Sequence, residues 1–276
     1  MGVVNANPDS FSDPGPRSLD TVVARAVELL DEGAVLIDVG AQSAITLRPP
    51  IDPAAEAGLV APAVEAILAA RPDAIVSVDT YKPAVVEAVL AAGAHLVNDV
   101  SGLGDRAVAR ACAAYGAGLV VMHTAAPPLT RLQRRDRYAD VAREVAEFLG
   151  QAVAAALEDG VAAESIVVDP GVDFTKTPAQ TVALLRDIER VVALGYPVLL
   201  ALSRKDFVGA LTGRPPSQRL AGTLGAVAAV RDVPGQILRV HDVAAVRDLL
   251  VVLDAVAGRV DVPADLLLPD DLRHER

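Results

Sequence analysis

The chain has 276 residues, of which 52% are hydrophobic and 3% aromatic, and its formal net charge is −11. This length and apolar content suit one large α/β domain, while the acidic balance and the scarcity of aromatic rings argue against a nucleic-acid-binding protein. Charged residues or glycine interrupt the apolar runs, and no charged-then-apolar leader opens the chain. The single cysteine, Cys112, has no disulfide partner. We therefore expect a soluble cytoplasmic protein without a membrane segment.

Short apolar, β-branched segments alternate with longer amphipathic segments, a pattern typical of strand–helix units repeated around a parallel sheet. Eight units in this length favour a single-domain (β/α)8 TIM barrel over an open doubly wound sheet. The barrel is expected to span residues 1–258, followed by a polar C-terminal tail at 259–276. The predicted strands, in chain order, are 2–5, 35–40, 74–79, 95–100, 118–123, 165–169, 197–202 and 236–241.

Polar side chains mark the carboxyl ends of these strands, where the active site of such a barrel is built. Unpaired polar groups at a barrel mouth cost free energy unless they face water or a ligand, so the set indicates a site. Its members are Asn5, Asp38, Asp79, Asn98, His123, Asp169, Ser203, Arg204, Lys205, Arg239, His241 and Asp242.

Structural alternatives exist for several of these residues. Asp79 and Asp169 could cap helices, and Asn98 could close a turn. His123 lies among apolar neighbours and could be a packed histidine. Arg239 and His241 point to one face of the last strand and could belong to an ion pair.

The residue types nevertheless suggest a chemistry. Carboxylates and a carboxamide together can hold a planar heterocycle that has donor and acceptor edges. Arg239, His241 and Asn5 could converge on an anionic leaving group or its metal ion. The sequence has no Ser-His-Asp spacing, thiol nucleophile, zinc-ligand cluster or glycine-rich phosphate loop, so covalent nucleophilic catalysis is not expected.

Ordered motifs extend over nearly the whole chain, from Gly2 to about Ala257. They read GVVNANPDSFSD, SVDTYK, VNDVSG, VMH, DPGVDFTK, LSRKDFVGALTG and RVHDV. In order and spacing the chain resembles the dihydropteroate synthases. These enzymes join 4-aminobenzoate to 6-hydroxymethyl-7,8-dihydropterin diphosphate and release diphosphate in the presence of Mg2+. The resemblance also implies a homodimer formed by the last helices.

The resemblance implies a role for each matched residue. The pterin would be bound by Asp79, Asn98, Met122, Asp169 and Lys205, and the catalytic residues among these would be Asp79, Asp169 and Lys205. Asn5 would ligate Mg2+, and the diphosphate would contact Asn5, Arg239 and His241. The second substrate, 4-aminobenzoate, would be held by Ser43, Arg48, Pro49, Phe174 and Asp206.

Departures from the family pattern lie mostly on the side of the second substrate. Asp206 stands where the family has a serine that helps to hold the aminobenzoate carboxylate, and Asp173 and Thr175 lie in the segment that usually reads Gly-Phe-Gly-Lys. Three functions stay open: a dihydropteroate synthase-type transferase, a non-synthase paralogue that binds a pterin or folate, and a pterin-dependent methyltransferase. The intact SRK and RVHDV segments suit a diphosphate, which methyl transfer does not need.

Overall fold

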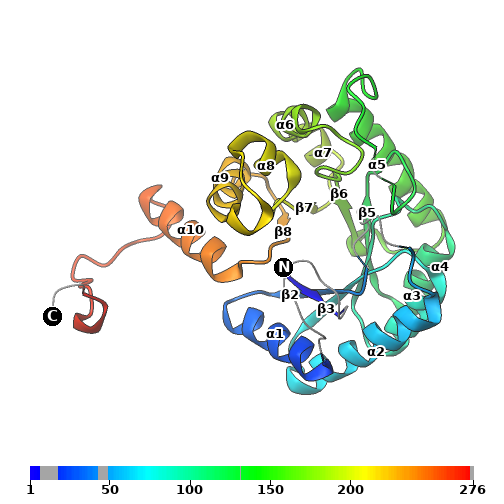
Figure 1. Cartoon of the computed structure of the whole chain (residues 1–276), viewed down its shortest axis with the longest axis horizontal. Helices are drawn as coiled ribbons and strands as arrows, with labels where there is room; N and C mark the ends of the chain where they lie inside the picture. The colour runs from blue at the N-terminus through cyan, green and yellow to red at the C-terminus, as the bar shows by residue number, and fades with distance from the viewer. Residues whose placement is uncertain (7–17, 43–48, 131, 274–276) are drawn as a thin grey trace.

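The computed structural model describes residues 1–6, 18–42, 49–130 and 132–273. Within these ranges eight parallel strands form one sheet in sequence order (Figure 1). All eight predicted strands are confirmed: β1 Gly2–Asn5, β2 Leu36–Gly40, β3 Ile75–Asp79, β4 Leu96–Asp99, β5 Gly118–Met122, β6 Ile166–Asp169, β7 Val198–Leu200 and β8 Gln236–Leu238.

The sheet closes on itself just beyond β8. Val3 N donates to Val240 O at 3.1 Å, and Val240 N donates to Met1 O at 3.0 Å, so the residue after Arg239 joins the first strand to the last. The predicted (β/α)8 barrel is therefore confirmed.

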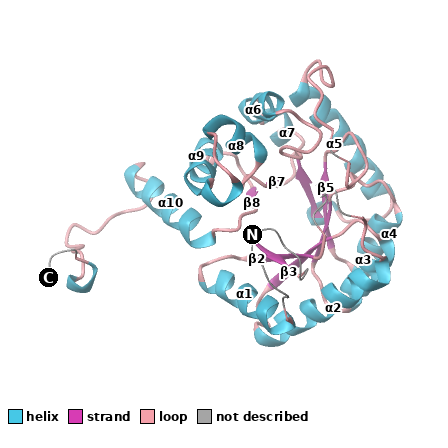
Figure 2. Ribbon diagram, viewed as in Figure 1, coloured by secondary structure: helices cyan, strands magenta, loops and turns pink. Residues whose placement is uncertain are grey.

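Helices surround the strands, as Figure 2 shows. Proline in the first turn opens α2, α3 and α6, where the missing N–H has no helical partner to lose. The described helices are α1 Leu19–Asp31, α2 Pro53–Ala70, α3 Pro83–Ala91, α4 Ala107–Tyr115, α5 Val141–Glu158, α6 Pro178–Arg186, α7 Glu189–Val192, α8 Asp206–Thr212, α9 Leu220–Val230 and α10 Val243–Val256.

Helix α2 is the one described helix whose length and mean hydropathy of 1.4 would suffice to cross a membrane. It packs between α1 and α3 on the outside of the barrel and buries Val60, Val64 and Ile67. It also carries Glu56, a buried carboxylate paired with Lys82. These contacts explain its apolar character, because a helix docked on a parallel sheet needs an apolar face.

The barrel interior changes from apolar to polar along the strands. One end is filled by side chains that include Leu96, Val120 and Leu199. Toward the carboxyl ends the register sets Asp38 opposite Ser77, Asp79 opposite Asn98 and Met122 opposite Asp169. Since alternate residues share a face of a strand, these polar groups enter the barrel at its mouth.

Helix α10 and the residues after it extend away from the barrel (Figure 1). The helix leaves Val251, Val252 and Val256 at 60%, 59% and 83% exposure. Beyond it, residues 266–268 add three exposed leucines. This end of the described chain therefore presents an apolar surface to solvent.

Candidate active site

Five residues from β2, β3, β4 and the end of β8 form what we call the acid–arginine cluster: Asp38, Ser77, Asp79, Asn98 and Arg239. Arg239 Nε donates to Asp38 Oδ2 at 2.7 Å, and Arg239 Nη2 donates to Asp79 Oδ2 at 3.0 Å. Asp38 is fully buried and also accepts from Ser77 Oγ at 2.6 Å and from Asn98 Nδ2 at 3.2 Å. Asp38 is therefore the centre of a buried, charge-assisted network.

The position of the Asp79 side chain depends partly on a glycine in the neighbouring strand. A Cβ at Gly40 would lie 3.2 Å from Asp79 Cβ, which is tighter than ordinary contact. Burial raises the pKa of Asp79 to about 7, although the Arg239 guanidinium opposes this rise. A carboxyl group with this pKa can change its protonation state near neutral pH.

Asn98 offers an unused acceptor. Because its Nδ2 donates to Asp38, its Oδ1 points away from that carboxylate. Oδ1 is buried and has no hydrogen-bond partner in the described residues. Buried polar atoms are nearly always hydrogen-bonded, so this atom indicates the place of a ligand donor.

The other part of the mouth, here named the lysine side, consists of His123, Asp169, Phe174, Lys176 and Lys205. Lys205 Nζ lies 4.7 Å from the centroid of the Phe174 ring. Burial lowers the pKa of Lys205, while the charges of nearby carboxylates, including Asp169, raise it. Burial also raises the pKa of Asp169, whose Oδ1 accepts from Gly171 N at 2.7 Å.

Lys176 lies fully buried within the loop between β6 and α6. Its Nζ contacts His123 Nδ1 at 2.9 Å and donates to Gly171 O at 2.9 Å and Phe174 O at 3.1 Å. Burial lowers the pKa of Lys176 to about 7, and burial together with Lys176 lowers the pKa of His123 to about 2. His123 is therefore a neutral, packed histidine, consistent with the structural alternative raised from the sequence.

The loop between β6 and α6 is held in a left-handed conformation at three alternate positions. Gly171, Asp173 and Thr175 have φ values of 67°, 65° and 53°. A Cβ at Gly171 would lie 2.0 Å from His123 O, so only glycine fits there. Asp173 accepts from Thr181 Oγ1 at 3.1 Å and from Phe207 N at 3.0 Å, which ties the loop to the first turn of α8.

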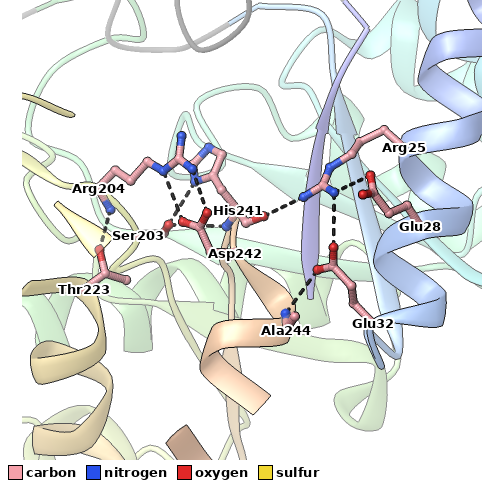
Figure 3. Close-up of polar contacts among 9 residues, drawn as sticks. All are labelled: Arg25, Glu28, Glu32, Ser203, Arg204, Thr223, His241, Asp242 and Ala244. Carbon is pink, nitrogen blue, oxygen red and sulfur yellow. Dashed lines mark hydrogen bonds and ion pairs between the residues drawn. The ribbon is translucent and has the colours of Figure 1, made fainter. Parts of the chain in front are cut away.

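A second polar network, the rim network, lies at the ends of β7 and β8 (Figure 3). Arg204 donates to Asp242 through Nη2 at 2.7 Å and Nε at 3.2 Å, and its own backbone N–H donates to Thr223 Oγ1 at 3.0 Å. His241 Nδ1 lies 3.0 Å from Ser203 Oγ. The network fixes both strand ends against α9.

Helix α1 supports the same strand end from outside (Figure 3). Arg25 Nη2 donates to His241 O at 2.9 Å, and Glu32 accepts from Ala244 N at 3.1 Å. The first and last helices thereby brace the region where the barrel closes.

A cavity of about 180 Å³ opens beside the lysine side. It lies among the loops that follow β4, β5, β6 and β7, and its lining includes Phe174, Lys205, Asp206, Asp173, Arg204, Thr124, Pro127 and Gln133. Asp206 pairs with Arg219 at 3.1 Å, so its negative charge has a counter-ion at the cavity wall.

The structure gathers most of the residues selected from the sequence at one mouth. Met122 is buried with Val100 against Tyr81 and Phe174. Asn5 ends β1 opposite Gly40. Pro49 O accepts from Gln42 Nε2 at 2.9 Å, whereas Ser43 and Arg48 lie outside the described residues.

The sequence analysis did not predict the roles of three residues that organise the site. Asp38 was recognised as a strand-end carboxylate but not as the centre of a network. Lys176 and Asp173 come after β6 and were not selected. Their signals were a lysine in a sequence with few lysines, and two non-glycine residues where glycine is usual.

A dedicated protein cage for a metal is not found in the described residues, where no three His, Cys, Asp or Glu side chains gather suitably. The Asn5 carboxamide could supply a single oxygen ligand at the mouth. Mg2+ commonly binds through one or two protein oxygens together with substrate phosphates and water, so this donor set fits a substrate-borne ion.

Comparisons with known proteins agree with this geometry. A family model described as "Pterin binding enzyme" matches residues 1–241. The chain is 39% identical over 264 residues to a Mycobacterium tuberculosis protein named "Inactive dihydropteroate synthase 2", covering 94% of this chain and 82% of that protein. It is 37% identical over 257 residues to Streptococcus pyogenes dihydropteroate synthase, covering 92% and 93%. It is also similar to the structure of Xanthomonas albilineans dihydropteroate synthase with 4-aminobenzoic acid, with a TM-score of 0.85, 39% identity and coverage of 95% and 93%.

Proposed function

Since the chain belongs to the family of pterin-binding enzymes, we propose that it is a dihydropteroate synthase-type transferase. It would join 6-hydroxymethyl-7,8-dihydropterin diphosphate to 4-aminobenzoate and release diphosphate, as a step of folate biosynthesis. The observation that carries this proposal is the buried Asn98 Oδ1, an acceptor that has no partner in the described residues and belongs to the residue paired in register with Asp79. A pterin edge with N–H donors matches these two acceptors.

The reaction can be assigned to the residues of the mouth. The C–O bond at the pterin methylene breaks, and its electron pair leaves with the diphosphate. The amine nitrogen of 4-aminobenzoate then bonds to the methylene carbon and loses a proton. Arg239 and His241 would stabilise the departing anion, while Asp79 and Asp169 would hold the ring whose positive charge develops.

We also propose the features that the family resemblance implies but no observation tests. Mg2+ would bind to Asn5 and the diphosphate, where it would neutralise phosphate charge. The protein would be cytoplasmic and would form a homodimer through α10, whose exposed Val252 and Val256 suit such a contact. Light scattering would test the dimer, since Val252→Asp should give monomers.

A non-synthase paralogue that binds a pterin is the second candidate. It is favoured by the relative named as inactive and by Asp206, which lies at the cavity wall where a carboxylate substrate would approach. A pterin-dependent methyltransferase is the third, and would bind pterin without releasing diphosphate.

The deciding experiment measures diphosphate release with Mg2+, with and without 4-aminobenzoate, for the wild type and for Asp206→Ser. Release that depends on 4-aminobenzoate and yields dihydropteroate supports the transferase. Pterin binding without turnover, particularly if Asp206→Ser restores some turnover, supports the paralogue. Asp169→Asn serves as the control for loss of the pterin site.

A further inference from the structure

The contact between Ser203 and His241 has a consequence for proton placement. Ser203 Oγ lies 3.0 Å from His241 Nδ1 and also accepts the backbone N–H of His241 at 3.3 Å (Figure 3). Ser203 is buried. One hydroxyl therefore meets both the main chain and the ring of the same histidine.

A hydroxyl has one hydrogen to donate and two lone pairs that accept. One lone pair of Ser203 Oγ is taken by the His241 backbone N–H. If Nδ1 also carried a hydrogen, Oγ would accept twice, and its own hydrogen would have no acceptor in the described residues. If Nδ1 is unprotonated, the hydroxyl donates to it and every group is satisfied. The second arrangement is favoured because an unsatisfied buried donor costs free energy.

We propose that Ser203 is a positioning residue that holds His241 in its Nε2–H tautomer, so that Nε2 presents a hydrogen-bond donor to the diphosphate at the barrel mouth. The tautomer follows from the contact alone. The identity of the anion rests on the proposed function.

Among the residues around His241, Ser203 is the one that orients the imidazole ring. Asp242, the carboxylate next in sequence, accepts from Arg204 through both of its oxygens, and the described hydrogen bond of the His241 ring is the one to Ser203. Arg25 fixes the main chain by donating to His241 O. The second ring nitrogen of an imidazole is set by the hydrogen bond that the first one makes.

The ring is neutral, which makes the choice of tautomer matter. The pKa of His241 is lowered to about 4, first by burial and then by the positive charges of Arg239, Arg204 and Lys205, against the opposing charge of Asp242. A neutral imidazole has a single N–H. His241 is half-buried, its Nε2 has no hydrogen-bond partner among the described residues, and its side chain lies on the same face as that of Arg239.

Nitrogen NMR of the full chain labelled in histidine tests the tautomer directly. The protein has four histidines, and His241→Gln identifies the signals of His241. We expect a protonated Nε2 and an unprotonated Nδ1 in the wild type and in Ser203→Thr, which keeps the hydroxyl. Ser203→Ala should shift the ring toward the other tautomer. Thr223→Val is the matched control, because it removes a rim-network hydroxyl that does not touch His241 and should leave the signals unchanged.

Calorimetry with inorganic diphosphate and Mg2+ tests the consequence. Ser203→Ala should bind diphosphate about tenfold more weakly, since one charge-assisted hydrogen bond is lost, and Ser203→Thr should recover most of the affinity. A wild-type ring protonated on Nδ1 would overturn the proposal, as would a Ser203→Ala ring that stays protonated on Nε2. If the wild type shows the expected tautomer but binds no diphosphate, the positioning role stands and the proposed function fails.

Discussion

The acid–arginine cluster and the lysine side bury charge in opposite ways. In the cluster, Arg239 lies between two carboxylates, and each charge meets its counter-charge within 3.0 Å. On the lysine side, Lys176 is satisfied by two carbonyl oxygens and a neutral imidazole, and Lys205 lies over an aromatic ring.

This difference separates what the fold requires from what a ligand can use. Within the cluster, Asn98 Oδ1 is the one buried side-chain atom that has no hydrogen-bond partner in the described residues. Lys205 has no hydrogen-bond acceptor in the described residues, so its ammonium can donate to a bound molecule. Substitutions that remove one partner at a time distinguish the two arrangements.

The largest effect is expected from Asp38→Ala. It leaves Asn98 Nδ2 and the Ser77 hydroxyl without their acceptor and Arg239 with one carboxylate, so the free energy of unfolding should fall by about 3–5 kcal/mol. Urea unfolding measures this loss. Ser77→Ala, which removes a single donor, should cost only about 1 kcal/mol. Equal losses for the two variants would mean that Asp38 is not the centre of the cluster.

Substitution by methionine should change the stability of the protein differently at the two lysines of the lysine side. Lys176→Met leaves His123 Nδ1 without its partner, whereas Gly171 O still accepts from Phe174 N and Phe174 O still accepts from Thr175 Oγ1. The free energy of unfolding should therefore fall by about 1–3 kcal/mol. Lys205→Met loses no described hydrogen bond and relieves the burial of a charge, so it should change stability by less than about 1 kcal/mol while abolishing pterin binding. Similar unfolding curves for both variants would contradict this distinction.

The protonation of Asp79 should appear in ligand binding. With a pKa of about 7, about a tenth of the side chain is ionised at pH 6 and about nine tenths at pH 8. N–H donors of a pterin prefer the carboxylate, so the affinity for 6-hydroxymethylpterin should rise about tenfold over this range. Calorimetry at both pH values measures it. Asp79→Asn keeps Asp169, so a rise that persists in this variant would have to come from another group.

The sequence predicted the barrel well because the fold depends on a repeated local pattern. Each strand is a short apolar run ending in a polar residue, and neither property needs distant contacts to be recognised. The positions of Asp79, Asn98 and Asp169 at one mouth then follow from the parallel topology.

Side-chain partners could not be predicted in the same way. Arg239 joins Asp38 and Asp79 across more than 150 residues of sequence, and the pairing depends on barrel closure and on the space left by Gly40. The contact between Asp206 and Arg219 depends on how α8 meets the segment before α9. The sequence showed Asp206 only as a substitution for the family's serine, and the structure adds its ion pair with Arg219.

The smallest change in the free energy of unfolding is expected from substitution of Asp173, which joins the left-handed loop to α8. Asp173→Gly removes a side chain from a backbone conformation that costs a non-glycine residue roughly 1–2 kcal/mol, but it also removes the acceptor of Thr181 and of Phe207 N. Two lost hydrogen bonds and a more flexible unfolded chain outweigh the relieved strain, so the free energy of unfolding should fall by about 1 kcal/mol. Asn tolerates the same backbone conformation and keeps one acceptor, so the free energy of unfolding of Asp173→Asn should lie between those of the wild type and Asp173→Gly. Urea unfolding ranks the three, and hydrogen exchange at the Phe207 amide should be faster in Asp173→Gly. A glycine variant more stable than the wild type would show that the strain exceeds what the contacts to α8 contribute.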